Sequence, residues 1–259
     1  KAWRPIPHVP SNNGNSTFKA VAKGDVLWHF PYHDFGNVVR WLQHAARDPL
    51  VRRISITLYR VAEGSAVCAA LMEAIQRGKK VTVFVEVQAR FDERTNLFWG
   101  EALEKAGAHV LYSYANLKVH CKLCLIERRE NNRTVRYAYL GTGNFNERTS
   151  QTYADMALLT AQPALTREVA EVFAHLGDRR HRPALSQLLM APLTLRDRLE
   201  TAIDKEIESA LVGKPAEILL KLNSLEDRAL IRKLYDASNA GVKVRLIIRG
   251  ICCLVPGVE

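Results

Sequence analysis

A strand–helix–strand pattern occurs twice in this chain, and it limits the fold more than any other feature of the sequence. Apolar and β-branched runs at 54–59 and 81–85 predict two strands, and the segment 65–77 between them has helical character. The same order returns over residues 218–248. Because a helical crossover of this length joins parallel neighbours, the pattern predicts an α/β fold whose sheet contains parallel strands.

The two occurrences correspond residue by residue. An ungapped offset of 163 residues aligns Gly78 with Gly241 at the ends of the two helices, and Leu71 with Leu234 inside them. Such self-similarity predicts an internal duplication. A second copy of a motif near position 120 would then fall near ~283. The chain ends before that position, so we expect its second half to be truncated.

Three regions are expected along the chain. Residues 1–24 are rich in Pro, Asn, Gly and Ser, which predicts an extended N-terminal arm or linker. Residues 25–187 are expected to form the first domain, and residues 188–259 the beginning of an incomplete second one, with the boundary after a basic loop at 178–183. The chain begins with Lys rather than Met, which suggests a fragment of a longer protein.

The charge balance indicates the class of partner. The sequence has 37 Lys and Arg against 27 Asp and Glu, a net charge of +10. This excess favours polyanions such as nucleic acid, anionic membrane, polyphosphate or nucleotide. No apolar run approaches the roughly 18 residues of a membrane span, and the first residues lack a signal-peptide pattern. We therefore expect a cytoplasmic protein without a membrane span.

The segment 117–126 carries the candidate chemistry. Its composition predicts a strand, and the alternation of side chains would place His120 and Lys122 on one face. An imidazole beside a fixed positive charge suits phosphoryl chemistry, because the nitrogen can attack phosphorus while the ammonium neutralises the phosphate oxygens. The same cation is expected to lower the pKa of His120 and keep the imidazole neutral.

Small residues and amides follow at the end of the next predicted strand, 135–140. Gly141 and Gly143 allow backbone N–H groups to approach an anion, and the side chains of Asn144 and Asn146 can donate to phosphate oxygens. Such strand ends commonly hold the ligand sites of α/β sheets. The sequence has no Walker-type phosphate loop and lacks the third glycine of a dinucleotide loop, which disfavours a P-loop kinase and a Rossmann oxidoreductase.

Six separated blocks, taken together and in this order, resemble the bacterial polyphosphate kinases of the phospholipase D type. They are Leu58-Tyr59-Arg60, the segment 86–93, Lys118-Val119-His120-Cys121-Lys122-Leu123, Gly141-Thr142-Gly143-Asn144-Phe145-Asn146, Tyr153-Ala154-Asp155 and Arg249-Gly250-Ile251-Cys252-Cys253-Leu254. One position departs from the phospholipase D superfamily, since Glu127 stands where that superfamily usually has Asp. The resemblance implies a phospholipase D-like mixed sheet flanked by helices, internally duplicated and with the second half truncated.

The resemblance also implies an activity. Members of the family are phosphotransferases that move the terminal phosphoryl group of ATP reversibly to inorganic polyphosphate through a phosphohistidine. His120 matches the histidine nucleophile of the family. We expect Lys122 and Asn144 to stabilise the phosphoryl oxygens of the reacting group.

Four further positions match binding residues of the family. Its Mg²⁺-site positions fall on Arg60 and Arg90, which we interpret as clamps on phosphate oxygens beside the ion, because a guanidinium has no acceptor. Surface salt bridges are the alternative for both arginines. The nucleotide contacts fall on Tyr153 and Arg249. Tyr153 could equally be a half-buried aromatic residue of a strand rather than a platform for adenine.

The match covers one catalytic domain and the start of a second, without the second histidine of the family. The isolated chain is therefore expected to be inactive in polyphosphate synthesis. Two alternatives stay open: a phospholipase D-superfamily phosphodiesterase or nuclease acting as a dimer, and a non-catalytic basic module that binds polyanions. The expected partners are ATP or ADP, Mg²⁺, inorganic polyphosphate and the remaining domains of the polypeptide, without sequence-specific nucleic acid. A homo-oligomer and peripheral association with the inner membrane are left open.

Overall fold

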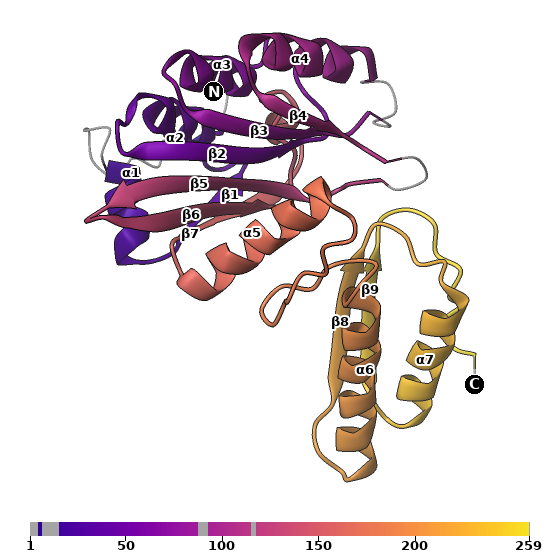
Figure 1. The fold of residues 1–259 in the computed structure, drawn as a ribbon. Coiled ribbons are helices and arrows are strands. Elements are labelled where there is room, and N and C mark those ends of the chain that lie inside the picture. Colours follow the sequence, from indigo (N-terminus) through magenta and orange to yellow (C-terminus); the bar gives the residue numbers. More distant parts are fainter. Residues whose placement is uncertain (1–4, 7–15, 88–92, 115–117, 259) are drawn as a thin grey trace. The chain divides into compact units, whose positions relative to one another are not determined.

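A computed structural model of the chain describes residues 5–6, 16–87, 93–114 and 118–258. The chain divides into two compact units, Lys1–Gln187 and Leu188–Glu259 (Figure 1). Each unit has its own sheet, with seven strands in the first and two in the second.

The first unit is built on a mixed sheet. Its strands lie in the spatial order β1 (Val26–Phe30), β7 (Asp155–Thr160), β6 (Arg133–Gly141), β5 (Lys122–Glu130), β2 (Val51–Leu58), β3 (Lys80–Val85) and β4 (His109–Tyr112). The neighbours β2, β3 and β4 are parallel, whereas the remaining neighbouring pairs are antiparallel. The predicted mixed sheet is confirmed, and its parallel part is limited to the strands joined by helical crossovers.

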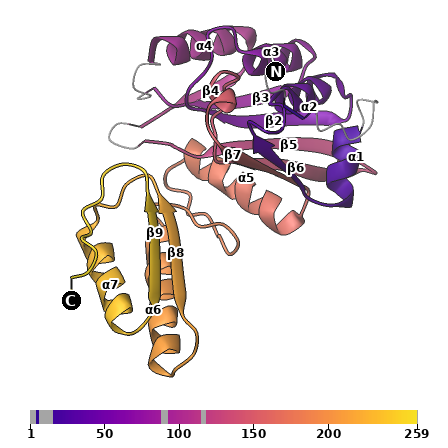
Figure 2. The same cartoon turned by 180° about the vertical axis from the view of Figure 1, so that it is seen from behind.

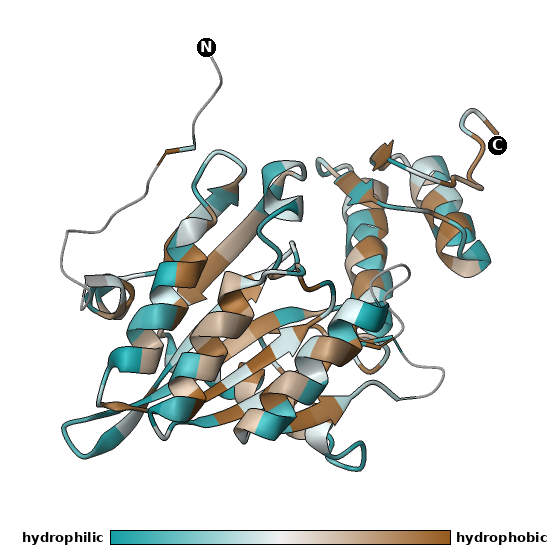
Figure 3. Cartoon of the chain, turned by 90° about the horizontal axis from the view of Figure 1, so that it is seen from above, coloured by the Kyte–Doolittle hydropathy of each residue, from teal (hydrophilic) through white to brown (hydrophobic). Residues whose placement is uncertain are grey.

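Helices cover both faces of this sheet. On one face α2 (Gly36–Arg47), α3 (Ala66–Gln76) and α4 (Glu93–Ala106) lie side by side, and α5 (Pro163–Gly177) lies on the other (Figures 1 and 2). Seen from the side of the three helices, the strands beneath them are largely hydrophobic (Figure 3). None of the helices in the described part of the chain has the length and apolar character needed to cross a bilayer.

Local sequence explains where α3 begins and ends. The hydroxyl oxygen of Ser65 accepts a hydrogen bond from the backbone N–H of Cys68 at 3.2 Å, which caps the first turn. After the last turn Gly78 has φ +78°, a left-handed conformation that favours glycine and directs the chain into β3. Between these ends, Val67 and Leu71 are fully buried against the sheet.

Residues 16–23 correct the expectation of an extended arm over 1–24. They form the helix α1 (Ser16–Lys23), on which Phe18 and Val21 are buried. The Phe18 ring packs edge-on against Tyr137 of β6, with 4.8 Å between the centroids. Apolar burial therefore holds α1 on the first unit. Residues 1–4 and 7–15 of the predicted arm lie outside the described residues.

The turn between β5 and β6 consists of two residues. Only Asn131 and Asn132 form it, with φ values of 46° and 62°, and Glu130 pairs directly with Arg133. Two consecutive residues with positive φ are typical of the tight turns that join antiparallel strands. The polar residues before and after the turn are therefore strand residues at the rim of the sheet.

The second unit repeats part of the first. It contains α6 (Leu195–Leu211), β8 (Glu217–Leu222), α7 (Arg228–Asn239) and β9 (Lys243–Ile248), with β8 and β9 parallel. The offset of 163 residues maps β3 onto β9 without a gap. The turns before these strands share a hydrogen bond, from Lys79 N to the carbonyl of Ala74 and from Val242 N to that of Ala237, each 3.0 Å. The duplication predicted from sequence therefore extends to backbone detail.

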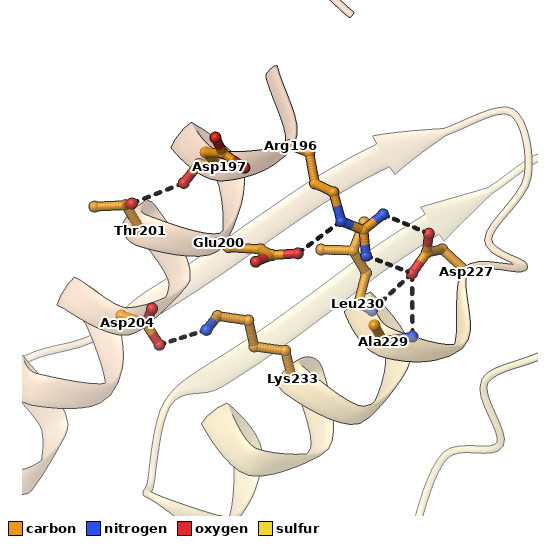
Figure 4. Close-up of polar contacts among 9 residues, drawn as sticks. All are labelled: Arg196, Asp197, Glu200, Thr201, Asp204, Asp227, Ala229, Leu230 and Lys233. Atoms are coloured by element: carbon orange, nitrogen blue, oxygen red, sulfur yellow. Dashed lines mark hydrogen bonds and ion pairs between the residues drawn. The ribbon is translucent and has the colours of Figure 1, made fainter. Parts of the chain in front are cut away.

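Charged side chains join α6 to α7 (Figure 4). Asp227 caps α7 by accepting two N–H groups of its first turn at 3.0 and 3.1 Å. Arg196 on α6 donates to both carboxylate oxygens of Asp227, at 2.7 and 3.1 Å, and holds the pKa of that carboxyl well below its usual range. One further ion pair, Lys233 with Asp204 at 2.6 Å, connects the two helices.

Candidate active site

Four strands of the first unit bring four of the six sequence blocks to one edge of its sheet. β2 ends at Leu58, which lies beside Val85 at the end of β3. Lys122 at the start of β5 lies opposite Gly141 at the end of β6. Segments that are far apart in the sequence therefore meet at this edge, as the sequence predicted for a ligand site.

His120 lies before β5 rather than within it. The strand predicted over 117–126 begins only at Lys122, so the expectation that both side chains share one strand face is wrong. The two residues are still adjacent, since Lys122 Nζ donates a hydrogen bond to the backbone carbonyl of His120. His120 is an exposed residue whose ring is partly covered by Tyr59, whereas Lys122 is only 5% exposed. Leu117 lies outside the described residues.

Two side chains hold the backbone on either side of the exposed histidine. Glu86, buried at the end of β3, accepts the N–H of Val119 at 2.7 Å. The hydroxyl of Thr57 on β2 accepts the N–H of Leu123 at 3.0 Å and donates to the carbonyl of Cys121 at 2.8 Å. Because these side chains bind the backbone around His120, the hydrogen-bonded strand β5 begins only at Lys122. The same bonds fix the segment that carries the imidazole.

The ring of Tyr59 contacts the charged groups of the site. It packs edge-on against the imidazole of His120, with 4.9 Å between centroids, and lies 4.8 Å from Lys122 Nζ. Lys118 Nζ and Arg60 Cζ are each 5.8 Å from the same ring. Cations are attracted to the face of an aromatic ring. Tyr59 was absent from the predicted site residues, and its only sequence signal is its place in the block that ends at Arg60.

The electrostatics of the site favour a neutral imidazole. Partial burial lowers the pKa of His120, and the positive charges of Lys122, Lys118 and Arg60 lower it further, against a smaller opposing effect of Glu86. Burial also lowers the pKa of Lys122, to about 8. At pH 7 the site therefore holds an unprotonated imidazole nitrogen beside a protonated ammonium group.

The glycine block packs against a carboxylate that sequence reasoning missed. A Cβ atom at Gly143 would lie 2.4 Å from Oδ2 of Asp155, so this position requires glycine. Thr142 donates its hydroxyl to Oδ1 of Asp155 at 2.7 Å. The same carboxylate raises the pKa of Lys122 against the effect of burial. Asp155 was present in one sequence block but carried no predicted role.

The two asparagines of the block have different environments. Asn146 was expected to donate to phosphate, which the structure contradicts because its side chain is buried and already bonded. Its Nδ2 donates to the carbonyl of Arg60 at 3.2 Å, and its Oδ1 accepts the N–H groups of Arg148 and Thr149. Asn144 is half-buried, and its side-chain oxygen has no hydrogen-bond partner among the described residues. No hydrogen bond joins its Nδ2 to another described residue either, so of the two side-chain amides that of Asn144 is the one available to donate to a ligand.

The remaining predicted residues are distributed over the chain. Arg60 is half-buried at the end of β2. Tyr153 is 48% exposed in the turn before β7, outside the strand predicted there. Arg249 belongs to the second unit, where its Nε donates to Oδ1 of Asn223 at 2.9 Å after the end of β9. Arg90 lies outside the described residues.

A protein-ligated metal is not supported by the described side chains. They contain no group of three His, Cys, Asp or Glu residues suited to holding an ion. Arg60 is positively charged and has no acceptor atom in its side chain. The described residues therefore do not by themselves fit a Mg²⁺ site.

Family models match almost the whole chain. The model described as polyphosphate kinase C-terminal domain 1 matches residues 16–182, and the model described as polyphosphate kinase C-terminal domain 2 matches residues 188–259.

Individual proteins agree with these matches. Polyphosphate kinases of Vibrio vulnificus and Escherichia coli K12 are each 46% identical, over 94% and 93% of this chain. The crystal structure of the polyphosphate kinase of Porphyromonas gingivalis superposes with a TM-score of 0.85 and 42% identity, covering 94% of this chain and 41% of that one. The chain spans about a third (35%) of the length of the curated relatives.

Proposed function

Since the chain belongs to the polyphosphate kinase family, we propose that it supplies the phosphoryl-accepting histidine of an ATP:polyphosphate phosphotransferase. The observation that carries this proposal is the placement of the His120 imidazole against the Tyr59 ring, around which Lys118, Lys122 and Arg60 gather; burial and these charges also lower the pKa of His120. A neutral nitrogen is a nucleophile, and the surrounding cations attract the phosphate groups that it must approach.

The proposed reaction has two steps. The lone pair of a His120 ring nitrogen forms a bond to the γ-phosphorus of ATP while the bond from that phosphorus to its bridging oxygen breaks, so that ADP leaves with the electron pair. The terminal oxygen of a polyphosphate chain then attacks the phosphohistidine and releases the neutral imidazole. Lys122 and Asn144 stabilise the charge on the transferred oxygens in both steps.

The other matched residues take binding roles in this proposal. Arg60 and Arg90 hold phosphate oxygens in the bidentate geometry that a guanidinium favours. Tyr153 stacks on the adenine ring, for which its exposed ring is suited. Arg249 is assigned to nucleotide binding only through its match to a nucleotide contact of the family. The Mg²⁺ that accompanies ATP has no assigned step, because the described side chains do not fit it. The reaction is proposed to take place in the cytoplasm, where ATP is available.

Labelling with ATP tests the proposal directly. Incubation of the chain with γ-labelled ATP is expected to give an acid-labile, base-stable label on the peptide that contains His120, as phosphohistidine does. The label should return to ADP, since the transfer is reversible. Without the second histidine of the family, net synthesis of polyphosphate is not expected from this chain alone. Cleavage of a phosphodiester substrate without a nucleotide-derived label would contradict the proposal and favour a nuclease.

A prediction on Tyr59 follows from its contacts. Tyr59→Leu removes the ring that favours the charged form of Lys122, so we expect the rate of labelling to fall by about 10- to 100-fold. The rate should also decrease at high pH as Lys122 loses its proton, and in Tyr59→Leu this decrease should begin at a lower pH than in the wild type. Tyr59→Phe keeps the ring, and the hydroxyl makes no hydrogen bond to another described residue. It should therefore retain the wild-type rate and pH profile. Equal losses in both variants would contradict the role of the ring.

A further inference from the structure

The positive charge of the chain is concentrated at the edge of the first unit's sheet opposite the candidate active site. Four connections meet there: 47–53 before β2, 77–80 before β3, 105–109 before β4, and 127–136 around the turn of the β5–β6 hairpin. These 26 residues contain eleven Lys and Arg against three Asp and Glu, a net charge of +8. The other 233 residues contribute only +2 of the total of +10. We call these four connections the basic edge.

The connections of the basic edge form one continuous surface. Arg53 pairs with Lys80 across β2 and β3, and Val51 pairs with Arg128 across β2 and β5. A hydrogen bond of 2.8 Å from the N–H of Arg129 to the carbonyl of Leu50 joins the hairpin to the loop before β2. Their side chains are therefore neighbours, although they come from distant parts of the sequence.

Local acidic side chains do not neutralise the basic edge. Each acidic group is already paired with arginine: Asp48 and Glu130 with Arg128, Glu73 of α3 with Arg47 and Arg77, and Glu127 with Arg53 and Arg136. Four exposed cations, Arg52, Lys80, Arg129 and Arg133, form no ion pair with any described residue.

The field of these cations acts on Lys79. Burial lowers the pKa of Lys79, and the nearby positive charges of Arg52 and Arg77 lower it further, against the opposing effect of Asp48. The repulsion among these like charges in the free protein decreases when an anionic partner binds. The basic edge is therefore built to bind negative charge that the described chain does not supply.

The side-chain chemistry selects the kind of anion. Eight of the eleven cations are arginines, whose planar guanidinium groups bind phosphate oxygens in pairs. The four connections contain no Phe, Tyr or Trp on which bases could stack, a feature that proteins binding single-stranded nucleic acid usually have. A polymer of phosphate without bases fits this surface better than a nucleic acid.

We propose that the basic edge is a second binding site for inorganic polyphosphate, separate from the site at His120. This inference rests on the proposed function, since it assigns a further contact to the same substrate. β2 spans eight residues, so the two sites are roughly 25 Å apart along the strand. A long polyphosphate chain can occupy both sites at once, and binding at the basic edge raises the effective concentration of its terminus near His120. A short chain cannot bridge them.

Binding of long-chain polyphosphate and of tripolyphosphate to the 259-residue chain, measured by calorimetry at several salt concentrations, tests this inference. The edge variant carries Arg52→Gln, Lys80→Gln, Arg129→Gln and Arg133→Gln. It should bind long-chain polyphosphate at least about tenfold more weakly, with the slope of log K against log[salt] reduced by about 3. Binding of tripolyphosphate should change much less. A charge-retaining variant, Arg52→Lys, Arg129→Lys and Arg133→Lys, should keep most of the affinity and shows that the edge still folds.

A matched control removes the same charge elsewhere on the surface, through Arg167→Gln, Arg198→Gln, Lys205→Gln and Arg232→Gln. Equal weakening in the control and edge variants would overturn the inference, as would unchanged affinity in the edge variant. Displacement of polyphosphate by single-stranded DNA or by anionic vesicles at equal charge concentration would also overturn it, in favour of nucleic acid or membrane. Labelling of His120 by ATP should persist in the edge variant, so a failure of the proposed function is detected separately.

Discussion

His120→Ala is expected to abolish the transfer of phosphate from ATP to the protein. Alanine has no nucleophilic atom, and the described site offers no second imidazole beside Lys122 to replace it. Removal of an attacking group that forms a covalent intermediate commonly lowers a rate by about 10³-fold or more. The measurement is the rate at which acid-labile label from γ-labelled ATP accumulates on the chain.

Because His120 is exposed, its replacement should change the labelling rate without changing the stability of the fold. Among the described residues its imidazole has one ring contact, the edge-on packing against Tyr59, so His120→Ala should leave the thermal unfolding temperature nearly unchanged. His109→Ala, an exposed histidine at the start of β4, is the matched control and should label at the wild-type rate. Label that persists in His120→Ala would place the phosphoryl acceptor elsewhere.

Lys122→Met should separate catalysis from stability. Methionine keeps the length of the side chain but removes the ammonium, and loss of a preorganised charge at the transferred oxygens lowers rates by about 10²- to 10³-fold. Lys118→Met, which removes a more distant and exposed cation from the same ring, should lose less than about tenfold. In the wild type, labelling should fall as the pH rises through about 8, because Lys122 loses its proton there. An equal loss in the two variants would contradict the special position of Lys122.

The same substitution should stabilise the fold. A lysine whose pKa is lower in the folded chain than in the unfolded chain binds fewer protons when folded, so its charge opposes folding at pH 7. That opposition is complete below about pH 8 and disappears as the pH rises toward the unfolded value of 10.5. Lys122→Met removes it, and we expect about 2 kcal/mol more free energy of unfolding at pH 7. Chemical denaturation at pH 7 and pH 10 measures the difference, which should shrink at the higher pH.

Elements with a regular pattern and clear end signals were predictable from sequence. α3 begins after its cap at Ser65 and ends before Gly78. The same helix-ending glycine recurs at Gly241, which allowed the strand–helix–strand pattern of the second unit to be predicted. α1 was not predicted because its apolar residues, Phe18 and Val21, are too few to form a recognisable helical period next to a segment rich in Asn and Gly. Its burial depends on Tyr137, more than 100 residues further along the chain.

The site was predictable in its residue types and less so in its geometry. The pairing of His120 with Lys122 is visible in the sequence, but the start of β5 depends on Glu86 and Thr57, whose side chains take hydrogen bonds that a longer strand would have used. Asn146 looked equivalent to Asn144, and only the loop at Arg60 shows that its amide is already bonded. Contacts of this kind join residues far apart in the sequence, and no local pattern encodes them.

The two anchors around the histidine have a consequence for backbone dynamics. The amides of Val119 and Leu123 are bonded to the buried side chains of Glu86 and Thr57, whereas no hydrogen bond from the amides of His120 and Cys121 leads to another described residue. Amide hydrogen exchange should therefore show two slowly exchanging positions enclosing two fast ones. The carbonyls of His120 and Cys121 are themselves held, by Lys122 Nζ and by the Thr57 hydroxyl, so solvent can reach these two amides while the backbone that carries the imidazole keeps its place.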